Sequence, residues 1–595
     1  CTRVTQSLDQ VSYHSRKIRK YSEFPIMMML AKVTIFVLLA SLTGDVYANV
    51  FLGRNSDQLP SSKASLDFEN ALLGELEKVL GIEHRTFTER RLSKIEQVVR
   101  PIFTAMPRNE HGKLGHGAAS YVLHRLFVQR HAWFIQGLEP GSKGDAAWNE
   151  TSPLTLFEDR VPEYVLTIFE QRIGGLGMGV HEIAVLAATL EHLVHKEAMY
   201  KLQLAYKANG FSPEDVTTTS EAINVLDTYM AVYILGCILK NKTAPSLEDV
   251  QFLSGKIQDW YPTWSDTQEF MREVRESVAP HRDYLYFSDV ATVIEEAGER
   301  YGRWQDAECR YLKDTLLAVE DTGPGGAGRI RLADFYGLAL NEGNWQFTES
   351  LSHLRRLGAL DESHPDNPRV IVANYVNGLS NCVASSSFYS VCCINECEGL
   401  LAHLEQKLAR PEALPSEIVT IVESLLSPTQ QTSRQLSPWL RHQLDIVAAQ
   451  HDGLVPLHGR LFLQWMHFAY PRECEYPHVS GTIDPIHNGD AMDDPELARG
   501  LSADEEEMRH HFESMPARIE KILNFSAHEE LELLSMEEEL IVWSPHSQSS
   551  SMLPRPVHML LRGVAFVAAV VISSLGLVKR FEAHLGQTSQ EKFYV

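Results

Sequence analysis

The chain is 595 residues long and carries a net charge of −24 at pH 7. Its 44% hydrophobic and 22% charged residues are typical of an ordinary globular protein with a sizeable core. The acidic balance, without clusters of lysine and arginine in the body of the chain, excludes a surface built for nucleic-acid phosphates. Cation binding and simple solubility are both compatible with it.

The N-terminal region has the order of parts of a secretory signal peptide. Residues 1–26 include a basic cluster and are interpreted as a leader upstream of the native start. Methionines at 27–29 then precede an apolar run at 33–42 and the small-residue pattern Val46-Tyr47-Ala48. Because a membrane-spanning helix needs roughly 20 residues, about twice the length of this run, we predict a signal peptide at 27–48. An uncleaved signal anchor is the alternative.

The C-terminal region contains a longer apolar stretch, from Val557 to Val578, interrupted by Arg562. Lys579 and Arg580 follow it, which favours a cytoplasmic C-terminus under the positive-inside rule. We predict a transmembrane helix within 554–580 and a cytoplasmic tail at 581–595, with a buried core helix as the alternative. Both ends together predict a single-pass type I protein of the secretory pathway or plasma membrane, with its body luminal or extracellular.

The cysteines indicate an oxidising compartment. Cys237 lies in an apolar run and is predicted to be a buried free thiol, and Cys1 belongs to the leader. The others are expected to form disulfides whose connectivity the sequence leaves open: Cys309, Cys382, Cys392, Cys393, Cys397 and Cys474. A zinc site is the alternative, but the paired Cys-x-x-Cys knuckles of structural zinc are missing. Sequons at Asn149, Asn241 and Asn524 fit a glycosylated ectodomain.

The body of the chain is predicted to be mainly α-helical. Apolar residues recur at spacings of three and four within 49–295, as in Ile183, Leu186, Leu190 and Leu193, and we assign this range to a helical N-terminal domain. Further helices are expected in a C-terminal subdomain at 406–480. Residues 481–553 are assigned to an acidic stalk whose charges form a solvated face. No internal repeat is evident in the helical domain.

The region at 296–405, which also holds the cysteine cluster, carries the most informative pattern. A helix-like segment at 309–319 leads to Asp321 and then through a run of glycines to Gly328. Ile330 follows two residues after that glycine, and Asp334 lies in the next helix-like segment. The same order recurs further along the chain, where Asp361 precedes 369–370 and Asn374.

This pattern, over about 75 residues at 305–380, resembles an EF-hand pair. In an EF-hand loop, a glycine at position six makes the sharp turn and an acidic residue at position twelve closes the coordination. Gly328 and Asp334 stand at those offsets, with the aliphatic Ile330 at position eight. The resemblance implies two helix-loop-helix units joined by a short two-stranded β link between 329–330 and 369–370.

The resemblance departs from the calcium-binding pattern at the early loop positions. Counted back from Gly328, positions one, three and five fall on Gly323, Gly325 and Ala327, which offer no side-chain oxygen. The candidate metal ligands are therefore few: Asp321, Asp334, Ser363 and Asn374. Since calcium takes about six to eight oxygens, we expect calcium binding at low affinity at most, no other cofactor, and a pair kept as a scaffold.

Two wider resemblances accompany the pair. The whole chain is similar to uncharacterised protist membrane proteins that carry such a pair, which implies no activity. A third unit of the same kind is a hypothesis for residues 451–462, where a turn again precedes a helix-like segment.

A histidine set in the helical domain offers an enzymatic alternative. His124 and His131 share one helical face, and His192 and His195 follow Glu191 on another. Helical bundles can assemble metal sites from such residues, but the Glu-x-x-His and His-Glu-x-x-His spacings are missing. We therefore favour histidines that are satisfied by the core or exposed at the surface.

The favoured function is a non-enzymatic, membrane-anchored scaffold or interaction ectodomain built around the degenerate EF-hand pair. Protein partners are expected, and no catalytic residue is predicted. A calcium-binding EF-hand sensor and a helical His/Glu metalloenzyme are the alternatives.

Overall fold

The structure, a computed structural model, describes residues 85–135, 138, 177–236, 246–342, 345–365, 367–383, 385, 389–485, 500–513 and 537–540. All of them belong to one compact unit that ends at Trp543. The predicted leader, signal peptide, transmembrane helix and cytoplasmic tail lie outside the described residues, as do Cys237 and the three sequons. None of the described helices has the combination of length and apolar character that crossing a bilayer requires.

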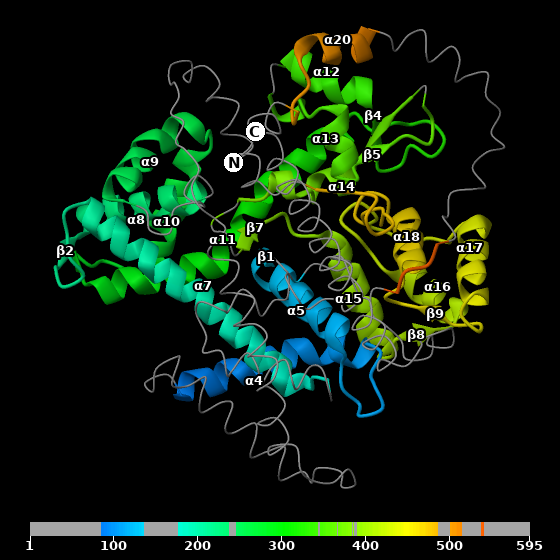
Figure 1. Cartoon of the computed structure of the whole chain (residues 1–595), viewed down its shortest axis with the longest axis horizontal. Coiled ribbons are helices and arrows are strands. Elements are labelled where there is room, and N and C mark those ends of the chain that lie inside the picture. The colour runs from blue at the N-terminus through cyan, green and yellow to red at the C-terminus, as the bar shows by residue number, and fades with distance from the viewer. Residues whose placement is uncertain are drawn as a thin grey trace, which may run out of the picture. The chain divides into compact units, whose positions relative to one another are not determined.

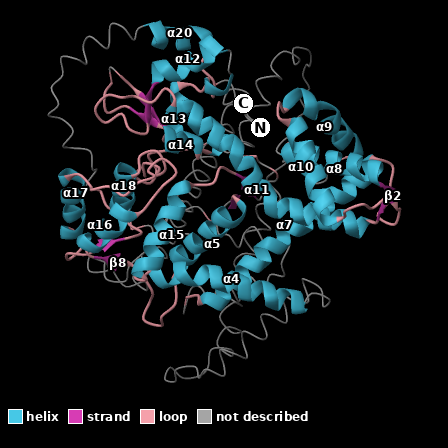
Figure 2. Ribbon diagram, turned by 180° about the vertical axis from the view of Figure 1, so that it is seen from behind, coloured by secondary structure: helices cyan, strands magenta, loops and turns pink. Residues whose placement is uncertain are grey.

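The prediction of a mainly helical body is confirmed (Figure 2). The N-terminal part contains α4 (Arg85–Ala105), α5 (His116–His131), β1 (Trp133–Ile135), α7 (Val180–Ala208), β2 (Thr217–Thr218), α8 (Thr219–Ile234), α9 (Leu247–Trp260), α10 (Trp264–Val278), β3 (Tyr284–Leu285) and α11 (Phe287–Leu317). The middle part contains β4 (Arg329–Arg331), α12 (Leu332–Glu342), η5 (Trp345–Phe347), α13 (Leu351–Arg356), β5 (Leu360–Asp361), β6 (Arg369–Ile371), α14 (Val372–Val376), η6 (Leu379–Asn381) and β7 (Tyr389–Val391). The C-terminal part contains α15 (Glu396–Leu408), β8 (Glu412–Ala413), α16 (Pro415–Ser424), α17 (Pro438–Ala449), β9 (Val455–Pro456), α18 (Arg460–Ala469) and α20 (Glu505–Glu513).

The apolar spacing of α7 is matched by its burial. Ile183, Leu186, Leu190 and Leu193 are all buried in the N-terminal core, which confirms the sequence pattern. Local signals set several helix starts. In α8 the Thr218 hydroxyl and the Glu221 carboxylate form a capping box, which satisfies N–H groups that have no partner within the helix.

α11 is a single long helix that runs across the predicted domain boundary at 295–296 (Figure 1). Its first half contributes Val293 and Tyr301 to the N-terminal core. Its second half contributes Leu312 and Leu316 to a second core built around α12 and α14. A third core lies between α15, α16, α17 and α18. The two neighbouring cores are therefore joined by one continuous helix at this boundary.

Several helix–strand–helix units are joined in pairs, because the short strand of one unit pairs in antiparallel fashion with the short strand of another. β4 pairs with β6, and Ile330 lies opposite Val370, which confirms the predicted two-stranded link; β5 adds to the other edge of β6. The same arrangement recurs in the β2–β3 and β8–β9 pairs, and as a single bridge between Leu114 and Met178. A helix follows each of these strands and bridge residues within a few positions, except β5, which leads into β6. The unit hypothesised at 451–462 coincides with β9 and the start of α18, whereas the β2–β3 pair and the Leu114–Met178 bridge were not predicted from the sequence.

Three disulfides join these parts of the fold, which confirms the prediction for the described cysteines. Cys309 in α11 bonds Cys393 after β7, and the Cys382–Cys392 bond closes a short loop beside it. Cys397 at the start of α15 bonds Cys474 after α18. None of the cysteines in the described part of the chain is free. The disulfides resolve the connectivity that the sequence leaves open.

We expect the two long-range disulfides to stabilise the fold more than the local one. The bonded cysteines are separated by 84 and 77 residues in the long-range bonds and by 10 in the Cys382–Cys392 bond. A longer closed loop removes more entropy from the unfolded chain, so replacing both Cys309 and Cys393 by serine should cost about 2–4 kcal/mol, and the Cys382/Cys392 double replacement clearly less. Urea unfolding without reductant measures both. Equal losses would contradict the loop-length argument.

Candidate functional site

Two similar loops meet at the β4–β6 link. The first loop (residues 321–328) follows α11, and the second (residues 361–368) joins β5 to β6. Each loop begins with an aspartate and is followed directly by an arginine at the same spacing, Asp321 to Arg329 and Asp361 to Arg369. The N–H of Asp321 donates to the carbonyl of Arg329 at 2.8 Å, and Asp361 pairs with Arg369 across β5–β6. Each loop therefore closes like a hairpin, with one aspartate and one arginine at its base.

The aspartates also shape the turns inside the loops. Asp321 Oδ1 accepts the N–H of Gly323 at 3.1 Å, and Asp361 Oδ1 accepts the N–H of Ser363 at 3.0 Å. Such aspartate turns hold the loop backbone without any further ligand. The first loop ends at Gly328, whose φ of 70° lies in the left-handed region that favours glycine. A Cβ at this position would collide with the carbonyl oxygen of Pro471.

The two arginines interact across the loops. Arg329 Nε donates to Asp361 Oδ2 at 2.7 Å, and Arg369 Nη2 donates to the same oxygen at 3.1 Å. Arg369 also reaches the first loop, where its Nη1 lies 3.8 Å from Asp321 Oδ2 and 3.4 Å from the carbonyl oxygen of Pro324. These four side chains, which we call the crossed Arg–Asp cluster, place guanidinium groups between the two loops. The residue exposure of Arg329 and Arg369 is only 7% and 5%.

Burial makes the pairing within this cluster essential, because an isolated charge is costly in a protein interior. Burial alone would raise the pKa of Asp361, but Arg329 and Arg369 hold that pKa well below its usual range. Burial also lowers the pKa of Arg329, and the charge of Asp361 opposes this shift. Two cations and two anions therefore balance each other at the base of the loops.

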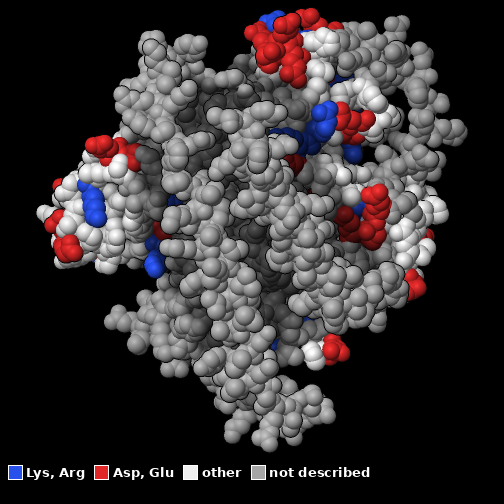
Figure 3. All heavy atoms as spheres, in the orientation of Figure 1, with Lys and Arg blue, Asp and Glu red and all other residues white. Residues whose placement is uncertain are grey.

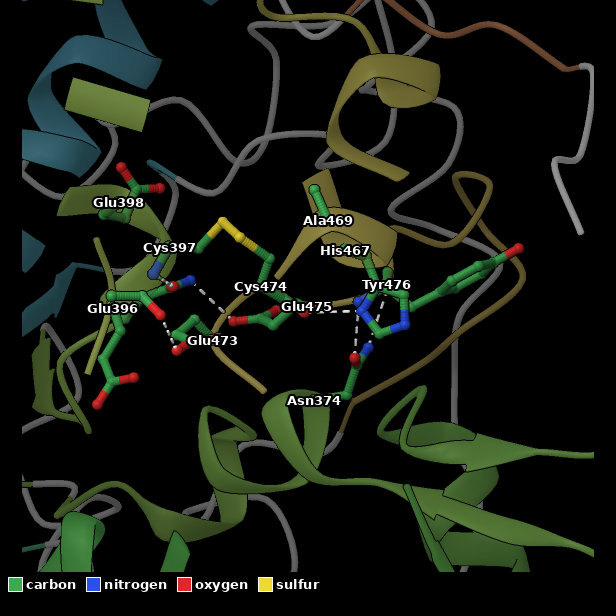
Figure 4. The surroundings of a disulfide bond; sticks show 12 residues. Asn374, Glu396, Cys397, Glu398, His467, Ala469, Glu473, Cys474, Glu475 and Tyr476 are labelled. Carbon is green, nitrogen blue, oxygen red and sulfur yellow. Dashed lines mark hydrogen bonds between the residues drawn. A yellow bond between two sulfur atoms is a disulfide. The ribbon is translucent and has the colours of Figure 1, made fainter. Parts of the chain in front are cut away.

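The predicted metal ligands have protein partners in the described structure. Asp334 accepts a hydrogen bond from Arg331 Nε at 2.6 Å, and Ser363 lies at the turn held by Asp361. Asn374 uses both ends of its amide on the backbone of Tyr476, at 2.8 and 2.9 Å, beside the Cys397–Cys474 disulfide (Figure 4). Among the described residues there is no group of three or more His, Cys, Asp or Glu side chains that could hold a metal ion.

The chain that follows α18, a helix of the third core, contacts residues at both loops. Arg472 makes a two-pronged ion pair with Glu320, at 2.8 and 2.7 Å, and the same carboxylate accepts the N–H of Gly328 at 2.6 Å. His478 Nε2 lies 2.7 Å from the carbonyl oxygen of Gly358. This contact was not predicted from the sequence, because its partners lie more than a hundred positions apart along the chain.

The histidines of the alternative site fall in two places. His124 packs edge-on against Phe134, and burial with the nearby Arg125 lowers its pKa to about 4. His131 stacks on Trp133 and lies 3.4 Å from Glu191. Glu191 also pairs with Arg91 and Arg130. Burial alone would raise the pKa of Glu191, but the contacts with His131 and with the two arginines hold that pKa below its ordinary value.

The other two histidines lie further along α7. The rings of His192 and His195 are 6.3 Å apart, and His195 Nδ1 lies 3.4 Å from Glu295. The set thus divides between His124 and His131 on α5 and His192 and His195 further along α7. The structure does not assemble it into a metal-binding group among the described residues.

In a second linked pair, a basic side chain of one unit again bonds an acidic side chain of the other unit. At the Leu114–Met178 bridge, Lys113 Nζ donates to Glu182 Oε1 at 2.6 Å, and Glu182 Oε2 accepts the N–H of Gly179 at 2.9 Å. Burial raises the pKa of Glu182, but Lys113 and the backbone bonds outweigh it and lower that pKa. Lys113 precedes its bridge residue as Arg329 precedes Ile330. Internal cations therefore close loops in two of the linked pairs.

No protein-family model, curated protein or solved structure matches this chain. The arrangement of its own residues is accordingly the basis for a proposed function.

Proposed function

We propose that this chain is a non-enzymatic, membrane-anchored scaffold or interaction ectodomain whose degenerate EF-hand pair is held together without metal. The observation that carries this proposal is the crossed Arg–Asp cluster. Its guanidinium groups lie between two loops joined through Ile330 and Val370, the positions at which EF-hand loops pair. The carboxylates of Asp361 and Asp321 lie 3.1 and 3.8 Å from the Arg369 guanidinium.

The chemistry of the cluster supports a metal-independent role. Calcium sites gather several anionic oxygens around a divalent cation. Here the available carboxylates already face guanidinium groups, and Asn374 is committed to the backbone of Tyr476. A calcium ion would have to displace buried Arg369, and it would then lie beside the remaining positive charge of Arg329. Such a displacement is unfavourable because like charges repel strongly at low dielectric.

The disulfides support a place in the secretory pathway or outside the cell. Such bonds form and persist in oxidising compartments and are rare in the reducing cytosol. The bonds of Cys309 and Cys397 each join segments far apart in the sequence, as expected of a fold that matures with its disulfides. Membrane anchorage remains part of the proposal and rests on the apolar C-terminal stretch of the sequence.

Calcium is expected to leave the protein unchanged. In a calorimetric titration of the purified chain we expect no binding heat at micromolar calcium, and thermal melts with calcium and with chelator should have the same midpoint. Elemental analysis of the same sample tests the metalloenzyme alternative, for which His192→Ala is the diagnostic variant. Micromolar calcium binding, or a melting point that falls in chelator, would favour the sensor. Stoichiometric zinc, iron or manganese lost in His192→Ala would favour the enzyme.

A further inference from the structure

α18 begins without an acidic residue of its own. Its N-cap is Gly459, which has no side chain, and no acidic residue lies in its first turn. Three other helices that follow a linking strand have such a group: Glu221 in α8, Asp289 in α11 and Glu417 in α16 each bond back to the N-cap backbone. The first N–H groups of a helix need an acceptor, and its N-terminus favours negative charge. α18 therefore requires an acceptor from elsewhere.

The acidic segment 537–540 supplies that acceptor from the same chain. Leu461 N–H donates to Glu538 Oε1 at 3.1 Å, and Arg460 N–H donates to the carbonyl of Glu539 at 2.8 Å. The Arg460 side chain donates to the carbonyl of Glu537. Figure 1 shows this short orange segment beside α18. Residues predicted to form a solvated acidic face are thus bound to the body at this point.

Residues that precede and follow α18 in the chain make further contacts with the segment. His451 Nε2 lies 2.9 Å from Glu538 Oε2. The Glu539 carboxylate accepts the N–H and the hydroxyl of Ser480, at 3.0 and 2.9 Å. Leu540 forms an antiparallel bridge with Gly459. The body therefore binds the carboxylates of Glu538 and Glu539 through different residues, and it also binds the backbone of the segment.

The body is shaped to receive this segment. Arg460 is only 2% exposed, so its guanidinium is held in place. A Cβ at Gly459 would lie 3.1 Å from Glu538 Oε1, a tight approach that glycine avoids. The Glu538 side chain is itself 15% exposed. A buried guanidinium that binds the backbone of the segment, a glycine that allows its close approach, and a helix N–H and a histidine that hold the largely buried Glu538 carboxylate together form a built site for an acidic peptide.

We propose that the entrance to α18 is a binding site for acidic peptides of the Glu-Glu-Glu-Leu type, occupied in this structure by the chain's own residues 537–540. We call it the acidic-peptide site; its residues are His451, Gly459, Arg460, Leu461 and Ser480. The proposal deepens the proposed function, because it rests on an interaction role and names the chemistry of the partner. A partner's acidic segment exchanges with the segment that the chain itself provides.

Tethering decides how readily such an exchange occurs. A segment on the same chain is present at an effective concentration on the order of millimolar, so a peptide that binds with micromolar affinity competes poorly with it. Removing the carboxylate of Glu538 weakens the internal competitor and leaves the receptor residues intact. Peptide affinity should therefore rise in that variant, although the variant itself has lost a contact.

The test is a fluorescence anisotropy titration of the purified full chain with a labelled peptide of the sequence of residues 535–542. We expect Glu538→Ala to bind the peptide with micromolar affinity and at least tenfold more tightly than the wild type. Glu538→Gln keeps the shape of the side chain and serves as the second variant if the alanine variant does not fold. Glu506→Ala, an exposed charge loss in α20, is the matched control and should bind like the wild type.

Two outcomes would overturn the proposal. One is that both Glu538 variants bind no more tightly than the wild type and Glu506→Ala. The other is that a peptide with glutamine at the place of Glu538 binds the Glu538 variants as well as the parent peptide does, since recognition would then not involve the carboxylate. The proposed metal-independent role is tested by calcium titration of the same samples, whereas the acidic-peptide site is tested by peptide binding, so the failure of one can be told from the failure of the other.

Discussion

Arg125→Met is expected to destabilise the chain by about 3–5 kcal/mol, because it leaves buried carboxylates without their cation. Arg125 in α5 is fully buried, and its guanidinium pairs with Glu398 and Glu405 of α15. It also donates to the carbonyl of Glu398 at 3.2 Å. Methionine preserves most of the length and apolar contact of the side chain, so the loss reports chiefly on charge. Urea unfolding at neutral pH measures it.

A matched control lies one turn further along the same helix. Arg130 is partly exposed, and its partner Glu191 keeps a second cation, Arg91, when Arg130 is replaced. Arg130→Met should therefore cost no more than about 1 kcal/mol. A similar loss in both variants would mean that general disruption of α5, rather than the buried ion pairs, causes the effect.

The pH dependence of the loss identifies the group responsible. Burial alone would raise the pKa of Glu405, but Arg125 and His458 hold it below its ordinary value. In the wild type this depressed pKa stabilises the fold above the ordinary carboxyl range, and the contribution disappears as pH falls through the folded pKa. Without Arg125 burial raises the pKa instead, so protonation relieves the variant and its deficit should shrink from pH 7 to pH 5. His458→Gln in both backgrounds removes the histidine that also contacts Glu405, so that the comparison reports on Arg125. A deficit that stays constant with pH would exclude Glu405 as its source.

The parts of the fold that were predicted correctly depend on signals within a few residues. The β4–β6 pairing follows from Gly328 and from the aliphatic residues Ile330 and Val370 two positions after each turn. The burial of α7 follows from its periodic apolar residues. The periodicity also continues through 290–316, with Val293, Tyr301 and Leu312 buried, so the sequence did contain evidence that α11 is continuous.

The parts that were missed depend on contacts between distant residues. β2, β3 and β8 have two residues each, which is too short to show an alternating pattern, so the β2–β3 pair and the strand that pairs with β9 of the hypothesised unit at 451–462 were not recognised. The crossed cluster joins Arg329 to Asp361 across two loops, and their spacing alone does not show that their side chains meet. The equal intervals from Asp321 to Arg329 and from Asp361 to Arg369 were nevertheless visible in the sequence as a possible sign of equivalent loops.

Charge runs were the least informative signal. The first turn of α20 is acidic and exposed, and Figure 3 shows acidic side chains gathered over this helix. The same helix buries Met508 against the second core, and Ser350 N–H bonds the carbonyl of Leu501 before it. Net charge predicts solubility rather than position, because one buried apolar residue and a few backbone bonds are enough to fix a charged segment.

Replacing both Arg329 and Arg369 by glutamine is the most direct test of the crossed Arg–Asp cluster. The double variant leaves Asp321 and Asp361 without the guanidinium groups that they face, and we expect it to lose about 5 kcal/mol or more in urea unfolding at pH 7, above the usual range for one broken buried pair. The control is Arg331→Gln, in the same strand. Its ion pair with Asp334 is partly exposed, so the loss should be no more than about 1 kcal/mol.

The effect of calcium on stability shows whether the two arginines act in these loops by their charge or only by packing. In the double variant, the Asp321 and Asp361 carboxylates and the Pro324 carbonyl oxygen lose the guanidinium groups that they face in the wild type. Calcium prefers such oxygens, so millimolar calcium should restore part of the lost stability in the double variant and leave the wild type and Arg331→Gln unchanged. Adding Asp361→Asn should also restore stability, since it removes an unpaired buried charge. A double variant as stable as Arg331→Gln would show that the fold does not depend on the cluster. A double variant that is unstable but indifferent to both calcium and Asp361→Asn would show that the arginines stabilise these loops by packing rather than by charge.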